Sequence, residues 1–322
     1  MRLCAIAAAG IVISIAGCQA GKKTEDRLAH EGDPSKTGKK YVIGMSQCNR
    51  GEPWRVQMDK DIEEAAKAHP DLEVLFKDAQ NKAETQQSQV REFVQQKVDL
   101  IIISPKEARP LTRPVEEAMD AGIPVIVLDR KVEGDKYTCF IGADNVKIGR
   151  EAGKFLVELL GGKGNVVELK GLMTSTPGQE RHKGFMEGIA GSNLKVVFDA
   201  DCQWLEPNAQ REMKSALSRF PTIDAVYGHN DPSAHGAYLA ARQEGKGREK
   251  TIKFVGIDAL PHEGVRYVKD GILTATFQYP TGGQEAIENA LKILKGEKVE
   301  KNITLGTRRF TKDNAETGGE AL

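Results

Sequence analysis

The architecture of this chain follows from one segment, Ile123-Pro124-Val125-Ile126-Val127-Leu128-Asp129-Arg130. The segment is apolar up to Leu128 and then ends abruptly at an acid followed by a base. A continuous apolar run of this length is typical of a strand buried on both faces of a parallel sheet. In open α/β sheets, ligands bind just beyond the carboxyl ends of the strands. Asp129 and Arg130 therefore mark the place where a binding site is expected.

Apolar strands with polar groups at their exits recur along the chain and alternate with amphipathic helical segments. This alternation is the signature of βαβ units that build a parallel sheet. We expect strands at 41–46, 73–77, 98–103, 124–128, 137–141, 165–169, 194–199, 223–227, 252–257 and 272–277, with another near 303–307. We expect helices at 53–68, 83–96, 108–121, 145–160, 178–190, 207–219, 232–244, 261–269 and 281–295. The pattern restarts after residue 141, which predicts two α/β halves with a cleft between facing strand ends.

Length and charge narrow the classes of function. The chain has 322 residues, and a single hydrophobic core rarely serves more than roughly 250–300 residues, so two domains are expected. Lysine plus arginine and aspartate plus glutamate number 46 each. This balance leaves no electrostatic footprint for nucleic acid or for an anionic membrane surface.

The N-terminus has the pattern of an export signal. Arg2 is followed by an apolar segment at 3–15, which is shorter than the about 20 residues that a membrane-spanning helix needs. The sequence Ile15-Ala16-Gly17-Cys18 resembles a bacterial lipobox, which implies that residues 1–17 are removed and that Cys18 is lipidated. A plain secretory signal cut nearby is the alternative. Residues 18–39 are polar and predict a flexible tether, so we expect an exported protein, periplasmic or at the cell surface, anchored by lipid to a membrane.

Three cysteines lie in the body of the chain, Cys48, Cys139 and Cys202. Their spacing does not match a metal site, and we expect neither a metal nor a cofactor. Three thiols allow at most one disulfide. Buried free thiols are the favoured interpretation, most clearly for Cys139, while the pairing of the others stays open.

Several motifs occur in order along residues 40–312 and resemble one family. They are Leu128-Asp129-Arg130, Gly142-Ala143-Asp144-Asn145, Val167-Glu168-Leu169-Lys170-Gly171, Glu180-Arg181-His182-Lys183-Gly184-Phe185, His229-Asn230-Asp231 and Gly256-Ile257-Asp258. The chain resembles the periplasmic sugar-binding proteins of ABC importers, specifically the ribose-binding and galactofuranose-binding proteins. The resemblance implies a type I periplasmic-binding-protein fold, with two doubly wound parallel-sheet α/β lobes joined by a three-strand hinge.

The resemblance also implies where the lobes divide. The first lobe would comprise 40–142 plus 279–301, and the second 143–278 plus 302–312, followed by a polar tail at 313–322. The three crossings of the hinge would then lie near Gly142, Gln278 and Lys301. Closure of two such lobes around a ligand is the expected motion.

In the family the sugar lies between the lobes, bonded by charged and amide side chains and packed against aromatic rings. The resemblance assigns this role to Asp129, Arg130, Arg181, Asn230, Asp258 and Gln278. A carboxylate can accept from two adjacent hydroxyls, and a guanidinium donates in a fixed fork, so these groups suit a sugar. Asp231 lies beside Asn230, and an alternative role for Asp231 is to cap the following helix.

The loop after the first strand, residues 49–55, departs from the sequence of ribose binders and looks like the corresponding loop of the galactofuranose-binding protein. Trp54 offers a flat apolar face, Arg55 a donor fork, and Asp78 a further carboxylate. Alternatively, Trp54 is a hydrophobic staple and Asp78 an ordinary loop acid. Trp204 lies near a stacking position of the family and Glu180 adjoins Arg181, so both are weaker candidates. This loop makes ribose less favoured and keeps other pentoses and hexoses open, including a furanose such as galactofuranose.

We expect a monomeric binding protein that captures one monosaccharide and presents it to the permease of an ABC importer. A sensor that docks on a membrane kinase or chemoreceptor is the alternative, because both partners would recognise the same closed state. An enzyme is disfavoured, because the chain has no nucleophile elbow, P-loop or dinucleotide motif. A carbohydrate-active enzyme would place acids such as Asp129 and Asp258 across one cleft. Sugar-responsive repressors share this core but carry a DNA-binding domain where this chain has an export signal.

Overall fold

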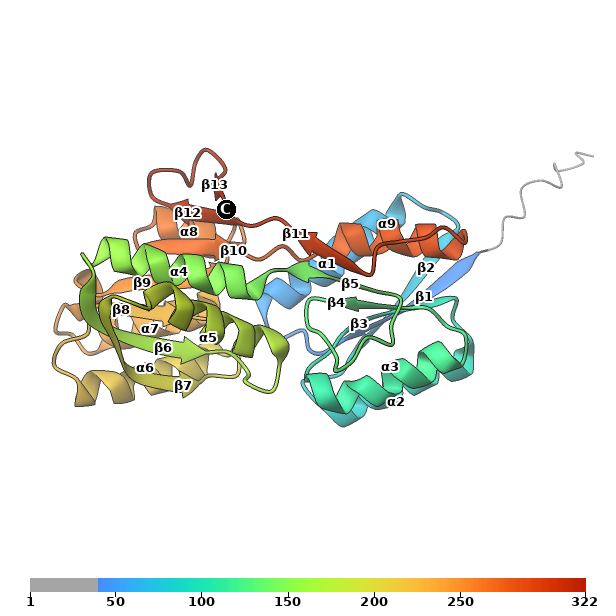
Figure 1. The fold of residues 1–322 in the computed structure, drawn as a ribbon, viewed down its shortest axis with the longest axis horizontal. Helices are drawn as coiled ribbons and strands as arrows, with labels where there is room; N and C mark the ends of the chain where they lie inside the picture. Colours follow the sequence, from blue (N-terminus) through green and yellow to red (C-terminus); the bar gives the residue numbers. More distant parts are fainter. Residues whose placement is uncertain (1–39) are drawn as a thin grey trace, which may run out of the picture. The chain divides into compact units, whose positions relative to one another are not determined.

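The computed structural model describes residues 40–322, which fold into two α/β lobes, each built on its own sheet (Figure 1). The predicted signal at 1–17, the tether at 18–39 and the lipid site Cys18 lie outside the described residues. Both sheets are wound in both directions from a central strand, which confirms the predicted doubly wound fold. No helix between residues 40 and 322 combines the length and the apolar composition that a membrane crossing requires.

The first lobe has a six-stranded parallel sheet in the order β11-β5-β4-β3-β1-β2. Its strands are β1 (Tyr41–Gln47), β2 (Leu72–Asp78), β3 (Leu100–Ser104), β4 (Val125–Leu128), β5 (Cys139–Ala143) and β11 (Asn302–Leu305), and its helices are α1 (Pro53–Lys67), α2 (Ala83–Gln96), α3 (Ala108–Asp120) and α9 (Gly283–Leu294). Successive residues of β3 face opposite sides of the sheet. Ile102 packs in the cluster that includes α1 and α9, whereas Ile101 and Ile103 pack in the cluster that includes α2 and α3. This explains why the strands read as continuous apolar runs.

The second lobe has a seven-stranded sheet in the order β13-β12-β10-β9-β8-β6-β7. Its parallel strands are β6 (Lys163–Lys170), β7 (Asn193–Asp201), β8 (Ala225–Gly228), β9 (Lys253–Asp258) and β10 (Ala275–Gln278), extended by the antiparallel strands β12 (Arg308–Thr311) and β13 (Glu320–Ala321). Its helices are α4 (Asn145–Leu159), α5 (Thr176–Ile189), α6 (Glu206–Arg219), α7 (Asp231–Gln243) and α8 (Gly264–Lys269), with a short 3₁₀ turn η2 (Arg248–Lys250). Residues 313–322 were expected to be only a polar tail. They supply the edge strand β13, and Ala315 within them is buried.

The chain crosses between the lobes after β5, after β10 and after β11. The prediction that the third crossing lies near Lys301 is wrong. β11 pairs in parallel with β5 of the first lobe, with Asn302 opposite Phe140, so the crossing falls between Leu305 and Arg308. The apolar pattern near 303–307 corresponds to β11, which stays in the sheet of the first lobe. The next short strand, at 308–311, joins the sheet of the second lobe.

Helices α4 and α5 approach so closely that their backbones are in contact. A Cβ atom at Gly149 of α4 would lie 2.3 Å from the carbonyl oxygen of Arg181, and one at Gly184 of α5 would lie 2.0 Å from the carbonyl oxygen of Val146. Gly153 and Gly188 meet in the same way one turn further along each helix. Glycine is required at these positions because any side chain would push the helices apart, and α5 carries Arg181 at this contact.

Candidate functional site

A narrow cavity lies at the strand exits, between the two lobes. Its lining side chains are buried and come from both lobes and from the crossing after β10. They are Glu52, Trp54, Arg55, Asp129 and Arg130 of the first lobe, Pro177, Arg181, Trp204, Asn230 and Asp258 of the second, and Tyr279 of the crossing. A wider groove beside α1 and α9 shares only Asp258 and Tyr279 with this cavity, and several of its other lining residues are exposed. The narrow cavity is the candidate site, because its lining side chains are buried and come from both lobes.

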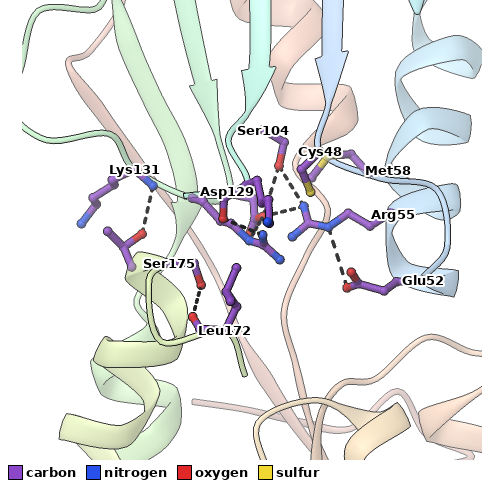
Figure 2. Close-up of polar contacts among 12 residues, drawn as sticks. Cys48, Glu52, Arg55, Met58, Ser104, Asp129, Lys131, Leu172 and Ser175 are labelled. Carbon is purple, nitrogen blue, oxygen red and sulfur yellow. Dashed lines mark hydrogen bonds and ion pairs between the residues drawn. The ribbon is translucent and has the colours of Figure 1, made fainter. Parts of the chain in front are cut away.

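An ion pair organises the first-lobe wall. Nη1 of Arg55 donates to Oδ2 of Asp129 at 2.6 Å and to Oγ of Ser104 at 2.8 Å (Figure 2). Arg130 also lies against Asp129, with its Nε 3.7 Å from Oδ2. Burial alone would raise the pKa of Asp129, but the charges of Arg55 and Arg130 outweigh it and hold the pKa below its ordinary value. Asp129 is therefore an anion held by two arginines.

Arg181 organises the second-lobe wall. Its Nε donates to Oδ1 of Asn145 at 2.8 Å, its Nη1 donates to the carbonyl oxygen of His229, and Oδ1 of Asp258 lies 3.9 Å from Nη1. Its guanidinium also lies 5.3 Å from the ring of Trp204. Arg130 of the other lobe lies 5.4 Å from the same ring. Trp204 is thus approached by guanidinium groups from both lobes, which is a favourable cation–π arrangement.

Asn230 and Asp231 have different roles from one another. Asn230 caps α7, because its Oδ1 accepts from the backbone N–H of Ser233 at 3.1 Å. The cap considered for Asp231 is therefore wrong. Asp231 is fully buried beneath the site, where it accepts from Oγ1 of Thr276 at 2.6 Å and from the N–H of Ala259 at 2.8 Å. The cap fixes Asn230 at the cavity wall.

Three lining residues have positive φ angles, which residues other than glycine rarely adopt. They are Asp129 at 67°, Trp204 at 70° and Asp258 at 129°. Each such residue costs of the order of 1–3 kcal/mol, and residues of this kind cluster at functional sites. The strain falls on side chains that line the cavity, which supports its assignment as the functional site.

Three of the predicted site residues lie outside the cavity. Asp78 accepts from the N–H of Gln80 at 2.7 Å and so forms an ordinary turn after β2. Gln278 lines the wider groove. Glu180 pairs with Lys131 at 3.4 Å. Tyr279 and Arg181, which follow Gln278 and Glu180 in the sequence, line the cavity, but the three predicted side chains do not.

Tyr279 is the most important lining residue that the sequence analysis missed. Its hydroxyl donates to the carbonyl oxygen of Asp129 at 3.1 Å, and its own carbonyl accepts from Nε1 of Trp54 at 2.8 Å. It follows directly after β10, so the rule that site residues lie at strand exits applies to it as it does to Asp258. Glu52 and Pro177 were also missed, and both lie at the start of a helix facing the cavity.

Comparison with known proteins agrees with this architecture. The family model described as a periplasmic binding protein domain matches residues 43–298. The chain belongs to this family. Among curated relatives, the ribose import binding protein RbsB of Bacillus subtilis is 34% identical over 275 residues, covering 84% of this chain and 88% of that protein. The family resemblance inferred from the sequence is therefore confirmed.

Two solved structures illustrate the similarity of fold. A fructose-binding periplasmic domain of a hybrid two-component system is 44% identical with a TM-score of 0.83, covering 86% of this chain and 92% of that chain. A protein from Mycobacterium smegmatis in complex with β-D-fucofuranose is 32% identical with a TM-score of 0.82, covering 86% and 93%. In each case nearly the whole binding fold is shared.

As expected for a periplasmic binding protein with its lobes together, direct bonds cross the cleft. The N–H of Lys131 in the first lobe donates to Oγ1 of Thr176 in the second at 3.0 Å, and Nζ of Lys131 pairs with Glu180. The N–H of Ala108 reaches the carbonyl oxygen of Thr174 at 3.4 Å. We call these contacts the interlobe clasp. It holds the lobes together without using a residue of the cavity lining.

The three cysteines of the described chain and the cavity acid Asp258 are all buried. Cys48, Cys139 and Cys202 are free and buried, as favoured from the sequence, and burial raises the pKa of Cys139 to about 11. Within residues 40–322, no group of histidine, cysteine, aspartate or glutamate side chains is arranged to hold a metal ion. Asp258 differs from Asp129, because burial raises its pKa well above the ordinary value despite the opposing charge of Arg181.

Proposed function

We propose that this chain is an extracytoplasmic solute-binding protein that closes on one monosaccharide and delivers it to an ABC importer. The observation that carries the proposal is a set of buried donors in the cavity lining. Nε of Arg55, Nε of Arg130 and Nε1 of Trp204 make no hydrogen bond within the described chain, since the paired carboxylate oxygens of Glu52 and Asp129 lie 4.0 Å and 3.7 Å from the two Nε atoms. A buried donor without a partner costs about 1–3 kcal/mol. A ligand that brings oxygen acceptors to them would remove this cost.

The side chains of the lining suit a polyhydroxyl ligand. Arg55, Arg130 and Arg181 lie in the same cavity as three carboxyl groups, Glu52, Asp129 and Asp258. Burial raises the pKa of Asp258, so this carboxyl can donate as well as accept, whereas the ionised Asp129 only accepts. Hydroxyl groups both donate and accept, so they satisfy carboxylates and guanidinium groups together. The two tryptophan faces would cover the apolar side of a sugar ring.

The similar structures indicate which sugar to test first. The two described above were obtained for a fructose-binding domain and for a β-D-fucofuranose complex. We propose a sugar in the furanose form as the ligand, with fructose as the first candidate. Galactofuranose and other pentoses and hexoses remain in the panel, and ribose is less favoured because of the Trp54-Arg55 loop.

Intrinsic fluorescence gives a direct test. The chain has two tryptophans, and both line the cavity, so their emission reports on occupancy. Residues 40–322 are titrated with D-fructose, D-ribose, D-galactose and L-arabinose. We expect a saturable change with one sugar, accompanied by about 2.7 kcal/mol of added stability at 100 times the dissociation constant. The Arg181→Ala variant should lose both effects, whereas no response to any sugar would sink the proposal.

The sensor alternative is supported by one observation, the 44% identity to the fructose-binding periplasmic domain of a hybrid two-component system. Deleting the gene separates the two roles. Loss of labelled fructose uptake, with the transcriptional response to fructose intact, is expected for an importer component. Retained uptake with a lost response would establish the sensor.

Binding without chemistry is part of the proposal. Asp129 and Asp258 both line the cavity, as an enzyme with two carboxylates would require, but Asp129 is held by Arg55 at 2.6 Å. We expect the sugar to be recovered unchanged from the complex by chromatography. Turnover of a glycoside or of the free sugar would instead indicate a carbohydrate-active enzyme.

We further propose that the mature protein is tethered to a membrane by lipid on Cys18. The proposal rests on the lipobox-like sequence that ends at Cys18. Cells grown with a labelled fatty acid should incorporate label into the wild-type protein. The Cys18→Ala variant should carry no label and appear in the soluble fraction, and equal labelling of both would contradict the anchor.

The interlobe clasp should tune affinity without touching the sugar. The Thr176→Val variant keeps the shape of the side chain but removes the acceptor for the N–H of Lys131. Because this bond forms only when the lobes are together, we expect about a fivefold weaker affinity, corresponding to about 1 kcal/mol. Calorimetric titration measures it. Thr174→Val is the matched control, since Thr174 joins the clasp through its backbone carbonyl, and an equal loss in both variants would argue against the clasp.

A further inference from the structure

Behind the second-lobe wall, a buried carboxylate holds two imidazole rings. Glu168 of β6 is fully buried, and its Oε1 lies 2.9 Å from Nδ1 of His182 and 2.9 Å from Nε2 of His229. His182 belongs to α5, and His229 follows directly after β8. One anion therefore ties together two elements that are far apart in sequence.

Each of the two histidines is the sequence neighbour of a residue that lines the cavity. His182 follows Arg181, and His229 precedes Asn230. The carbonyl oxygen of His229 also accepts from Nη1 of Arg181, so the loop that Glu168 holds is itself a support for the arginine. The ring of His229 is packed against Tyr227 as well, with centroids 5.1 Å apart.

We propose that Glu168 is a positioning residue for the binding site, which fixes the His229 loop against α5 and thereby sets the place of the Arg181 guanidinium. The inference deepens the proposed function and rests on it for its effect on sugar affinity. Glu168 touches no cavity atom itself, and it does not line the cavity.

The charge states agree with this role. Burial alone would raise the pKa of Glu168, but its bonds to His229 and His182 outweigh burial and lower the pKa. Burial lowers the pKa of His229, so its ring is neutral and donates Nε2–H to the carboxylate. Both oxygens of Glu168 act as acceptors, since Oε2 also lies 3.0 Å from Nδ1 of His182.

The test compares three variants by two readouts. Glu168→Ala removes the acceptor of both rings, and Glu168→Gln keeps one carbonyl oxygen, which His229 can use. Glu206→Ala is the matched control, because Glu206 accepts from Nδ1 of His235 at 2.8 Å in the same lobe but away from the cavity. The first readout is D-fructose affinity, and the second is hydrogen exchange of the Arg181 Nε–H by NMR, assigned with Arg181→Lys.

We expect Glu168→Ala to bind D-fructose at least tenfold more weakly and to exchange the Arg181 Nε–H at least tenfold faster. Glu168→Gln should recover affinity to within about threefold of wild type, because position and not charge is what matters. The control should lose stability only. Unchanged Arg181 exchange in Glu168→Ala, or a glutamine variant as weak as the alanine variant, would overturn the proposal.

Two further outcomes are separable. If the wild-type protein responds to no sugar, the proposed function fails, and Arg181 exchange without ligand still decides the positioning role. If Glu168→Ala does not fold, His182→Ala replaces it, because that side chain is 37% exposed and removes one of the two ties. The His182→Ala variant should then exchange the Arg181 Nε–H faster than wild type, and an unchanged exchange rate would reject the positioning role of Glu168.

Discussion

Replacing Gly184 by alanine should destabilise the protein and weaken ligand binding, although alanine is the better helix former. Helix propensity alone favours alanine by about 1 kcal/mol. However, the new Cβ would lie 2.0 Å from the carbonyl oxygen of Val146 and 2.9 Å from the backbone nitrogen of Arg150, and neither backbone atom can turn away. Overpacking of this kind costs about 1–3 kcal/mol and occasionally more. We expect a net loss of stability. The sign of the measured change shows whether overpacking or helix propensity is the larger effect.

The same substitution should reach the binding site, because α5 has to move away from α4. Arg181 lies one turn before Gly184, and its carbonyl oxygen is in the same interhelical contact at Gly149. We expect at least a tenfold loss of sugar affinity, measured by tryptophan fluorescence alongside urea unfolding. Lys183→Ala is the control, because Lys183 is exposed on the same helix and should change neither quantity. A Gly184→Ala variant more stable than wild type would show that the helices do not need this contact.

The sequence predicts the fold because hydrophobic periodicity is local. The run that ends at Leu128 is a buried strand in the structure, and Asp129 and Arg130 line the cavity at its exit. Trp54, Arg55, Arg181, Trp204, Asn230 and Asp258 were likewise expected, from the family motifs, and they also line it.

What the sequence could not show is which side chains meet across elements. Asp78 and Asp129 both follow strands, yet Asp78 closes a local turn while Asp129 meets Arg55, and nothing local distinguishes them. The third crossing was misplaced because one apolar pattern near 303–307 does not reveal which sheet receives each short strand. The glycine spacing of α4 and α5 is visible in the sequence, but the contact partner is a property of the tertiary fold.

The second large effect is expected at the buried ion pair of the first-lobe wall. The Asp129→Asn variant keeps the shape of the side chain, and asparagine tolerates the positive φ of 67° found there. It nevertheless takes from Arg55, which is 3% exposed, the carboxylate at 2.6 Å and leaves only Glu52, at 4.0 Å, as a counter-charge. Breaking one partner of a buried pair costs about 3–5 kcal/mol. We expect a loss of this size in urea unfolding, together with loss of sugar binding.

A double variant separates stability from binding. In Arg55→Met with Asp129→Asn, both charges of the closest pair are gone, and only Arg130, whose Nε lies 3.7 Å from Oδ2 of Asp129 in the wild type, still lacks its carboxylate. Part of the stability should therefore return, whereas the sugar still lacks its carboxylate and its donor fork. The exposed pair Arg150–Glu187, at 2.6 Å, is the control, and Glu187→Gln should change stability much less, because solvent screens this pair. A double variant as unstable as the single one would show that Arg55 is not the cause of the loss.

The pH dependence of the same variants gives an independent check of the charge. The pKa of Asp129 is lowered in the folded protein from its ordinary 3.8, so its contribution to stability is present above that value and is lost as pH falls through the folded pKa. The stability gap between wild type and Asp129→Asn should therefore be constant near neutral pH and shrink in strong acid. A gap that does not change down to acid unfolding would mean that the shape of the side chain, and not its charge, holds Arg55 in the wall of the binding site.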